Sequence, residues 1–187
     1  YCRRTNVGQI IFTSSVAVYG FAPEGTDEQG PFNPFNDYGR TKMEAEAVYR
    51  EWLAEDPSHR SLVIVRPTVI FGEQNRGNVY NLLRQIATNR FIMFGTGMNR
   101  KSMAYVENVA DFLAFSTKFG PGEHLYNYVD KPDLEMNELV TLCRSVLFGR
   151  KNVGLRLPSW LGVLIGYSFD ALSSVTRQRF PVSSIRV

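Results

Sequence analysis

The sequence contains few cysteines and no long apolar run. Its 187 residues include two cysteines, Cys2 and Cys143, whose spacing matches no metal-binding motif. This favours a reducing compartment over a disulfide framework. The apolar segment 160–169 is shorter than the roughly 20 residues of a membrane-spanning helix, and no signal peptide follows Tyr1. We therefore expect a cytoplasmic protein without a membrane span. Segment 160–169 is expected to form a buried or amphipathic helix, with docking on a membrane surface as the alternative.

The chain also lacks a large excess of charge of either sign. The chain has 21 Lys and Arg, 18 Asp and Glu, and a formal net charge of +3. Its basic residues come in scattered pairs, whereas nucleic-acid-binding proteins usually concentrate them on one face. Hydrophobic residues make up 44% of the chain, as in ordinary globular domains that bury a core. We therefore expect a globular protein that does not bind nucleic acid.

Two apolar runs without polar alternation predict strands of a parallel sheet. They cover residues 9–13 and 61–66, and such runs are typical of strands buried on both faces. A loop at 22–36, rich in Asn, Pro and Gly, and a predicted helix at 37–53 lie between them. The order strand, loop, helix, strand is a βαβ crossover, which predicts a doubly wound α/β sheet.

The second half of the chain has a less regular order. Helical spacing of apolar residues predicts helices at 78–88, 106–119 and 134–148. A strand is expected at 124–129, and a short apolar run covers 91–94. We find no internal repeat and no low-complexity segment.

A cluster of hydroxyl residues stands at the exit of the first predicted strand: Thr13, Ser14 and Ser15. Ligands of open α/β sheets bind outside the carboxyl ends of the strands, so these hydroxyls are well placed for a site. The alternative is that they cap their own backbone.

Tyr38 and Lys42 lie four residues apart at the start of the predicted helix, which puts both side chains on one face. A nearby ammonium favours the phenolate and lowers the pKa of a tyrosine, so that the tyrosine can act as a general base. Taken alone, the spacing is equally compatible with a solvated helix face.

Three motifs in order carry a resemblance to a known family. FTSSVAVYG, YGRTK and VRPTVIFG resemble the extended short-chain dehydrogenase/reductases, especially their NAD-dependent nucleotide-sugar epimerase and dehydratase branch. The later segments GTGMNRKSMAYVENVADF and HLYNYVDKPDLEMNELV also resemble that family. The resemblance implies the distal part of a Rossmann-type doubly wound parallel sheet, formed by 1–75 with 102–130. A small, mainly helical substrate-binding lobe would comprise 76–101 and 131–187.

The resemblance also implies roles for the residues of these motifs. Ser15, Tyr38 and Lys42 would be catalytic: Tyr38 would deprotonate a sugar hydroxyl that Ser15 orients, and Lys42 would hydrogen-bond the nicotinamide ribose. Thr13 and Ser14 would lie beside the nicotinamide of NAD. The cofactor would carry the redox chemistry while the protein positions and polarises the sugar.

Further residues would contact the cofactor or the nucleotide-sugar substrate. Pro67 would pack near the carboxamide of the cofactor, and Asn78 and Phe94 would contact the substrate. A guanidinium suits a pyrophosphate because it offers a fork of fixed charge, which favours Arg100 or Lys101. Asn78 could instead be a helix N-cap, and Arg100 and Lys101 an ordinary surface pair. Arg179 is a weaker candidate for phosphate binding.

The sequence departs from the family pattern in two places. It contains no G-x-x-G-x-x-G turn, which the family uses to hold the cofactor's pyrophosphate. We therefore expect the proximal βα units to be absent, a sheet edge to be uncovered, and the fragment to be inactive alone; NADP is not excluded. Val69 stands where some sugar epimerases have a polar residue.

The leading hypothesis is a UDP-hexose 4-epimerase-like isomerase of carbohydrate metabolism. The resemblance implies that the full-length protein forms a homodimer through the Tyr38-bearing helix and its neighbour. Dehydratases of this scaffold tend to have an Asp-Glu pair where this chain has Val16 and Ala17, which argues against dehydration. Another reductase, a hydroxysteroid-type dehydrogenase and a non-catalytic module of this fold stay open as alternatives.

Overall fold

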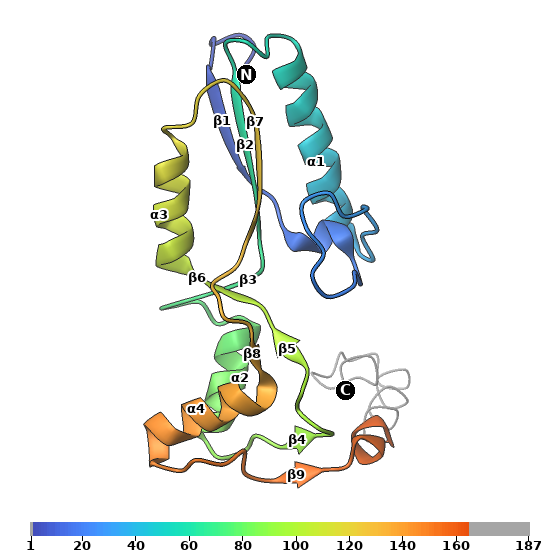
Figure 1. The fold of residues 1–187 in the computed structure, drawn as a ribbon, viewed down its shortest axis with the longest axis vertical. Coiled ribbons are helices and arrows are strands. Elements are labelled where there is room, and N and C mark those ends of the chain that lie inside the picture. The colour runs from blue at the N-terminus through green and yellow to red at the C-terminus, as the bar shows by residue number, and fades with distance from the viewer. Residues whose placement is uncertain (1, 165–187) are drawn as a thin grey trace. The chain divides into compact units, whose positions relative to one another are not determined.

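The computed structural model describes residues 2–164, and its chain divides into two compact units (Figure 1). Unit 1 comprises Tyr1–Gln74 and Ser102–Lys131, and unit 2 comprises Asn75–Lys101 and Pro132–Val187. Two of the sequence predictions fall partly or wholly outside the described residues: Arg179 and the end of the apolar segment 160–169. Residues 159–164 are helical.

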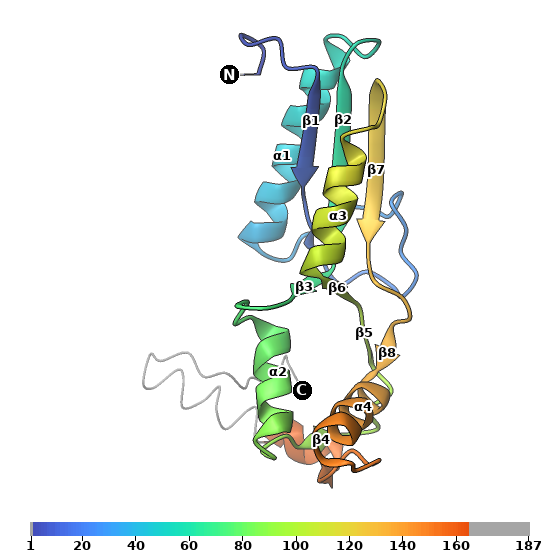
Figure 2. The same ribbon diagram turned by 90° about the vertical axis from the view of Figure 1, so that its left-hand side faces the viewer.

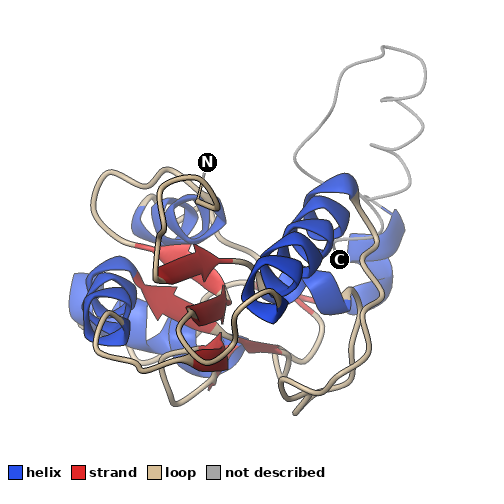
Figure 3. Ribbon diagram, turned by 90° about the horizontal axis from the view of Figure 1, so that it is seen from above, coloured by secondary structure: helices blue, strands red, loops and turns tan. Residues whose placement is uncertain are grey.

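Unit 1 is built on a parallel sheet of three strands. Its order is β1 (Gln9–Thr13), β2 (Ser61–Pro67) and β7 (Gly122–Tyr128). Helices α1 (Asp37–Ala54) and α3 (Val106–Ser116) cover opposite faces of this sheet (Figure 2), and seen from above the strands lie between helices (Figure 3). The α/β fold with a parallel sheet that the sequence predicts is therefore confirmed.

The uninterrupted apolar run of β2 is explained by its central position. All seven residues of β2 are buried, and Gln9 of β1 and Gly122 of β7 both pair with Ser61. On one face, Leu62 and Ile64 pack with Trp52 and Leu53 of α1. Each such aliphatic side chain stabilises the fold by about 1.5–3 kcal/mol when it is fully buried.

Short elements complete unit 1. A 3-10 helix, η1 (Val16–Tyr19), follows β1, and β3 (Val69–Phe71) pairs in parallel with β6 (Met103–Tyr105). Two predicted boundaries are wrong. The helix expected at 106–119 ends at Ser116, where Thr117 caps it, and the strand expected at 124–129 covers Gly122–Tyr128.

Within the described residues, unit 2 comprises helices α2 (Asn78–Ala87) and α4 (Met136–Phe148), the helical residues 159–164 and two pairs of short strands. Helix α2 packs against α4, with Ile86, Met93 and Val140 as the buried cluster. Strand β4 (Met93–Phe94) pairs with β9 (Arg156–Leu157), and β5 (Arg100–Lys101) pairs with β8 (Leu134–Glu135).

The helix predicted at 134–148 begins two residues later than expected. Leu134 and Glu135 pair with Lys101 and Arg100 as a strand. Glu135 is then the N-cap of α4, in a capping box with Glu138. The reciprocal hydrogen bonds of such a box fix the start of a helix.

No helix in the described part of the chain is long and apolar enough to cross a membrane.

Candidate active site

The hydroxyl cluster lies at the carboxyl end of β1, and Ser14 and Ser15 make different hydrogen bonds. Ser14 is buried, and its hydroxyl donates to Oε1 of Glu46 at 2.6 Å. Ser15 is the N-cap of η1, where its Oγ accepts a hydrogen bond from the backbone N–H of Ala17 at 3.2 Å. Ser15 thus caps its own backbone, as the alternative interpretation has it. Because that bond uses the oxygen as acceptor, the O–H of Ser15 can still donate to a ligand.

Tyr38 and Lys42 lie on the first two turns of α1. The helix is capped by Asn36, whose side-chain oxygen accepts from the N–H of Gly39 at 2.8 Å. The ammonium of Lys42 donates to the backbone oxygen of Thr13 at 2.8 Å and lies 5.8 Å from the ring centroid of Tyr38. The Tyr38 side chain is 55% exposed. Lys42 therefore connects the end of β1 with an accessible phenol.

A glycine allows α1 to approach η1 closely. A Cβ on Gly39 would lie 2.4 Å from the backbone oxygen of Ala17 and 3.0 Å from Cβ of Pro34. Only glycine fits that space without movement of the backbone. The first turn of α1, which carries Tyr38, therefore packs directly on the turn that Ser15 caps.

We predict that Gly39→Ala displaces the start of α1. Overpacking of this kind costs about 1–3 kcal/mol of stability, and a shift of about 1 Å at a catalytic group can lower turnover about 100-fold. Urea unfolding and steady-state kinetics of the full protein measure both effects. Gly8→Ala is the matched control, because an added Cβ at Gly8 meets nothing within 4 Å. Equal behaviour of the two variants would contradict the close approach.

Behind this strand end lies a buried ion pair that the sequence interpretation missed. Glu46 and Arg66 have 0% and 1% of their side chains exposed, and two hydrogen bonds of 2.8 and 2.6 Å join the guanidinium to the carboxylate. Arg66 also donates to the hydroxyl of Tyr19, which donates to Oδ1 of Asn127 at 2.8 Å. The pair thus connects α1, β2, η1 and β7.

Glu46 also fixes the catalytic candidates relative to one another. Residues 38, 42 and 46 follow one another at intervals of four along α1 and therefore share a face. Lys42 bonds to Thr13, the last residue of β1, and Glu46 bonds to Ser14, the residue after it, so the end of this strand is tied to consecutive turns of α1. The spacing of Glu46 is visible in the sequence, but its buried partner Arg66 is not.

Glu46 is ionised in spite of its burial. Burial opposes ionisation, but the hydrogen bonds from Arg66 and Ser14, together with the positive charges of Arg66 and Arg50, outweigh it and hold the pKa of Glu46 below its ordinary value. Burial likewise opposes the charge on Arg66, and its bonds to Glu46 outweigh that effect and raise the pKa of Arg66. The pair therefore stays charged at neutral pH.

Of the five residues expected to contact the substrate, Ser15 lies in unit 1 and the other four lie in unit 2. Asn78 is the first residue of α2, and Gly77 is its N-cap, so the alternative of Asn78 as N-cap is wrong. Phe94 lies in β4, and Arg100 and Lys101 form β5. A guanidinium nitrogen of Arg100 lies 4.0 Å from a carboxylate oxygen of Glu135.

Residues 1–128 match the NAD dependent epimerase/dehydratase family. The chain belongs to this family. Over 185 residues it is 54% identical to the N-acetyl-alpha-D-glucosaminyl-diphospho-ditrans,octacis-undecaprenol 4-epimerase of Escherichia coli O157:H7, covering 98% of this chain and 56% of that protein. It is 28% identical over 181 residues to the UDP-glucose 4-epimerase of Vibrio cholerae, covering 92% of this chain and 53% of that protein.

The fold of the chain is shared with a solved 4-epimerase. The UDP-glucuronic acid 4-epimerase from Bacillus cereus, solved in complex with NAD, superposes with a TM-score of 0.69 at 20% identity, over 84% of this chain and 52% of that one. The chain spans about half the length of the curated relatives named above. The resemblance to an epimerase and dehydratase family seen in the sequence is confirmed.

The carboxyl end of β2 suits the nicotinamide end of the family's cofactor. Pro67 ends β2 and is buried. The neighbouring Thr68 has a buried Oγ1 with no hydrogen-bond partner among residues 2–164. A buried hydroxyl of this kind usually has a partner, and a carboxamide can supply one. The sequence has no G-x-x-G-x-x-G turn, so this fit concerns the nicotinamide end alone.

Proposed function

We propose that the protein is an NAD-dependent 4-epimerase acting on a sugar joined to a diphosphate. The observation that carries the proposal is the arrangement around Lys42. Its ammonium bonds to the residue that begins the hydroxyl cluster and lies beside the ring of Tyr38. Membership of the epimerase/dehydratase family and the 54% identity to a 4-epimerase support it.

In this proposal Tyr38 is the general base. Its phenolate removes the proton from the C4 hydroxyl, and Lys42 stabilises the phenolate by its positive charge. Ser15 donates its O–H to the same sugar oxygen and holds it in place. NAD, with its nicotinamide end held at Pro67 and Thr68, would supply the reversible uptake of the C4 hydride that the reaction needs. Tyr38 gives the proton back after the other face of the keto sugar has been presented.

We further propose that the sugar is an N-acetylhexosamine carried by a polyprenyl diphosphate. The relative at 54% identity is named for such a substrate, whereas the UDP-glucose 4-epimerase is 28% identical. Sugar nucleotides are the second candidate, because the V. cholerae relative and the B. cereus structure are both named for UDP sugars. Both carriers present a diphosphate, for which Arg100 and Lys101 in unit 2 offer positive charge.

The assay of substrate choice compares two N-acetylglucosamine donors. The full protein is incubated with NAD and either polyprenyl-diphospho-N-acetylglucosamine in detergent or UDP-N-acetylglucosamine. We expect the C4 epimer to form faster from the lipid-linked sugar. Faster conversion of the UDP sugar would move the proposal to sugar nucleotides, and no conversion of either would contradict the epimerase itself.

We also propose a cytoplasmic homodimer with α1 at its interface. Val48 in the middle of α1 is 58% exposed, as expected for an apolar residue that a partner covers. Sedimentation velocity of the full protein should give a dimer that Val48→Asp converts to a monomer. A dimer unaffected by this change, or a monomeric parent, would contradict the interface.

The proposed cytoplasmic location agrees with the two free thiols of Cys2 and Cys143, which a reducing compartment preserves. Cell fractionation of the full protein checks this location.

A further inference from the structure

Helix α4 in unit 2 is apolar on the side that faces the core and on the side that faces away from it. Leu139 and Val140 are buried. On the outward side, Val146 is 78% exposed and Leu147 is 51% exposed, and Leu142 is also exposed. A large exposed apolar patch usually marks a surface that contacts another protein or a membrane. The outward face of α4 is therefore the surface that requires an occupant.

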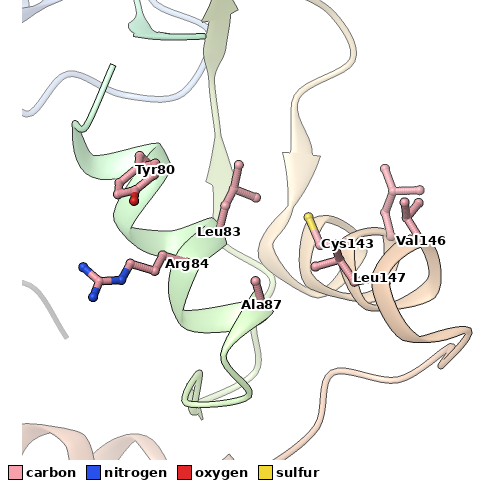
Figure 4. Close-up of a pocket in the computed structure, with 8 residues that line it drawn as sticks. Tyr80, Leu83, Arg84, Ala87, Cys143, Val146 and Leu147 are labelled. Carbon is pink, nitrogen blue, oxygen red and sulfur yellow. The ribbon is translucent and has the colours of Figure 1, made fainter. Parts of the chain in front are cut away.

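This face continues onto α2 and forms a groove (Figure 4). The groove has a volume of about 510 Å³, and Tyr80, Leu83 and Ala87 line it from α2. Of the eight residues that line it, Arg84 alone carries a full charge, and in Figure 4 its guanidinium points away from α4. The groove therefore has apolar walls, with the positive charge of Arg84 at its margin.

The charge of the chain is concentrated in the unit that carries the groove. Unit 2 has 12 Lys and Arg against 4 Asp and Glu, a net charge of +8, whereas unit 1 has 9 against 14, a net charge of −5. Residues 75–101 include five basic residues and no acidic one. The exposed Arg150 and Lys151 directly follow the residue that caps the end of α4.

We propose that this face docks unit 2 on an anionic lipid bilayer. Basic side chains at the margin are attracted to acidic headgroups, and apolar side chains between them enter the boundary of the acyl chains. A second copy of the same face is disfavoured because each copy would bring a unit with a net charge of +8, and like charges repel. The proposal rests on the lipid-linked substrate proposed above, since a polyprenyl chain keeps the sugar at the membrane surface.

Vesicle binding tests the docking without any turnover. The full protein is sedimented with vesicles of equal parts phosphatidylethanolamine and phosphatidylglycerol, and with vesicles of phosphatidylcholine alone. We expect binding to the anionic vesicles that weakens at high salt. Leu147→Asp should weaken it about tenfold, because it places a carboxylate in the interface. Lys151→Glu should weaken it as well and reduce its dependence on salt.

The control variants carry the same changes in unit 1. Phe115→Asp replaces an apolar helix residue of similar exposure, 54%, and Lys118→Glu reverses an exposed lysine. Both should leave vesicle binding unchanged. Equal binding to neutral and anionic vesicles, or binding unaffected by both Leu147→Asp and Lys151→Glu, would overturn the proposal. The latter result would mean that another part of the protein covers the groove. Because no substrate is present, a failure of docking is distinguished from a failure of the proposed epimerase.

Discussion

Replacement of Glu46 by Gln is expected to lower the free energy of unfolding by about 3–5 kcal/mol, the usual cost of removing one partner from a buried ion pair. The change leaves the guanidinium of Arg66 buried at 1% exposure without its counter-charge. It also weakens the bond that holds Ser14. Urea unfolding of the full protein measures the loss as a shift in midpoint at constant slope.

A glutamate on the exposed side of the same helix provides the control. Glu44 lies 2.8 Å from Arg40 in an exposed i, i+4 pair, and such pairs contribute little because water and salt screen them. Glu44→Gln should therefore leave the unfolding midpoint almost unchanged. If the two variants lost the same stability, the buried network would not be what holds α1 against β1 and β2.

The effect of Glu46→Gln should depend on pH. The pKa of Glu46 is lower in the folded protein than its ordinary value of about 4.3. A group with a lowered pKa adds stability that is complete above that ordinary value and is lost as pH falls through the folded pKa. The stability difference between parent and variant should therefore shrink below about pH 4. A difference that stayed constant through acid pH would contradict this assignment.

Replacement of Tyr38 by Phe is expected to lower kcat by about 10²–10⁴-fold, the usual contribution of a positioned general base. The phenol is more than half exposed, and the rest of the ring is kept in Phe. The unfolding midpoint should therefore stay the same. Steady-state kinetics with the better of the two sugar donors measure the loss, and KM should change little because substrate contacts are kept.

Another tyrosine of α1 separates catalysis from packing. Tyr49 packs its ring against Phe12 with centroids 4.8 Å apart. Tyr49→Phe also removes one hydroxyl from this helix, but at a position that the proposal does not use. It should retain almost full kcat. Turnover of Tyr38→Phe within a few-fold of the parent would remove Tyr38 from the mechanism.

The sequence predicts a strand or helix correctly where the hydrophobic pattern depends on that element alone. The buried runs at 9–13 and 61–66 predict β1 and β2 because a central parallel strand is apolar on both faces. The helix at 37–53 is confirmed to within one residue. Leu134 and Glu135 were assigned to a helix because two residues are too few to show the period of a strand.

The network behind the catalytic candidates could not be predicted in the same way. Arg66 stands in a motif noted for Pro67, and Glu46 stands one turn beyond Lys42. Nothing local shows that two charged residues 20 positions apart meet in the core. The bond between Lys42 and Thr13, and the space that only Gly39 fits, likewise depend on how α1 packs on the end of β1.

The most direct test of the central claim follows the hydrogen at C4. The full protein is given NAD and a sugar donor carrying deuterium at C4, and the epimerised product is analysed by mass spectrometry. The account predicts that the product retains its deuterium, because the hydride is removed and returned within a site where Tyr38 handles only the hydroxyl proton. Loss of the deuterium to solvent, or no epimer from either donor, would contradict it.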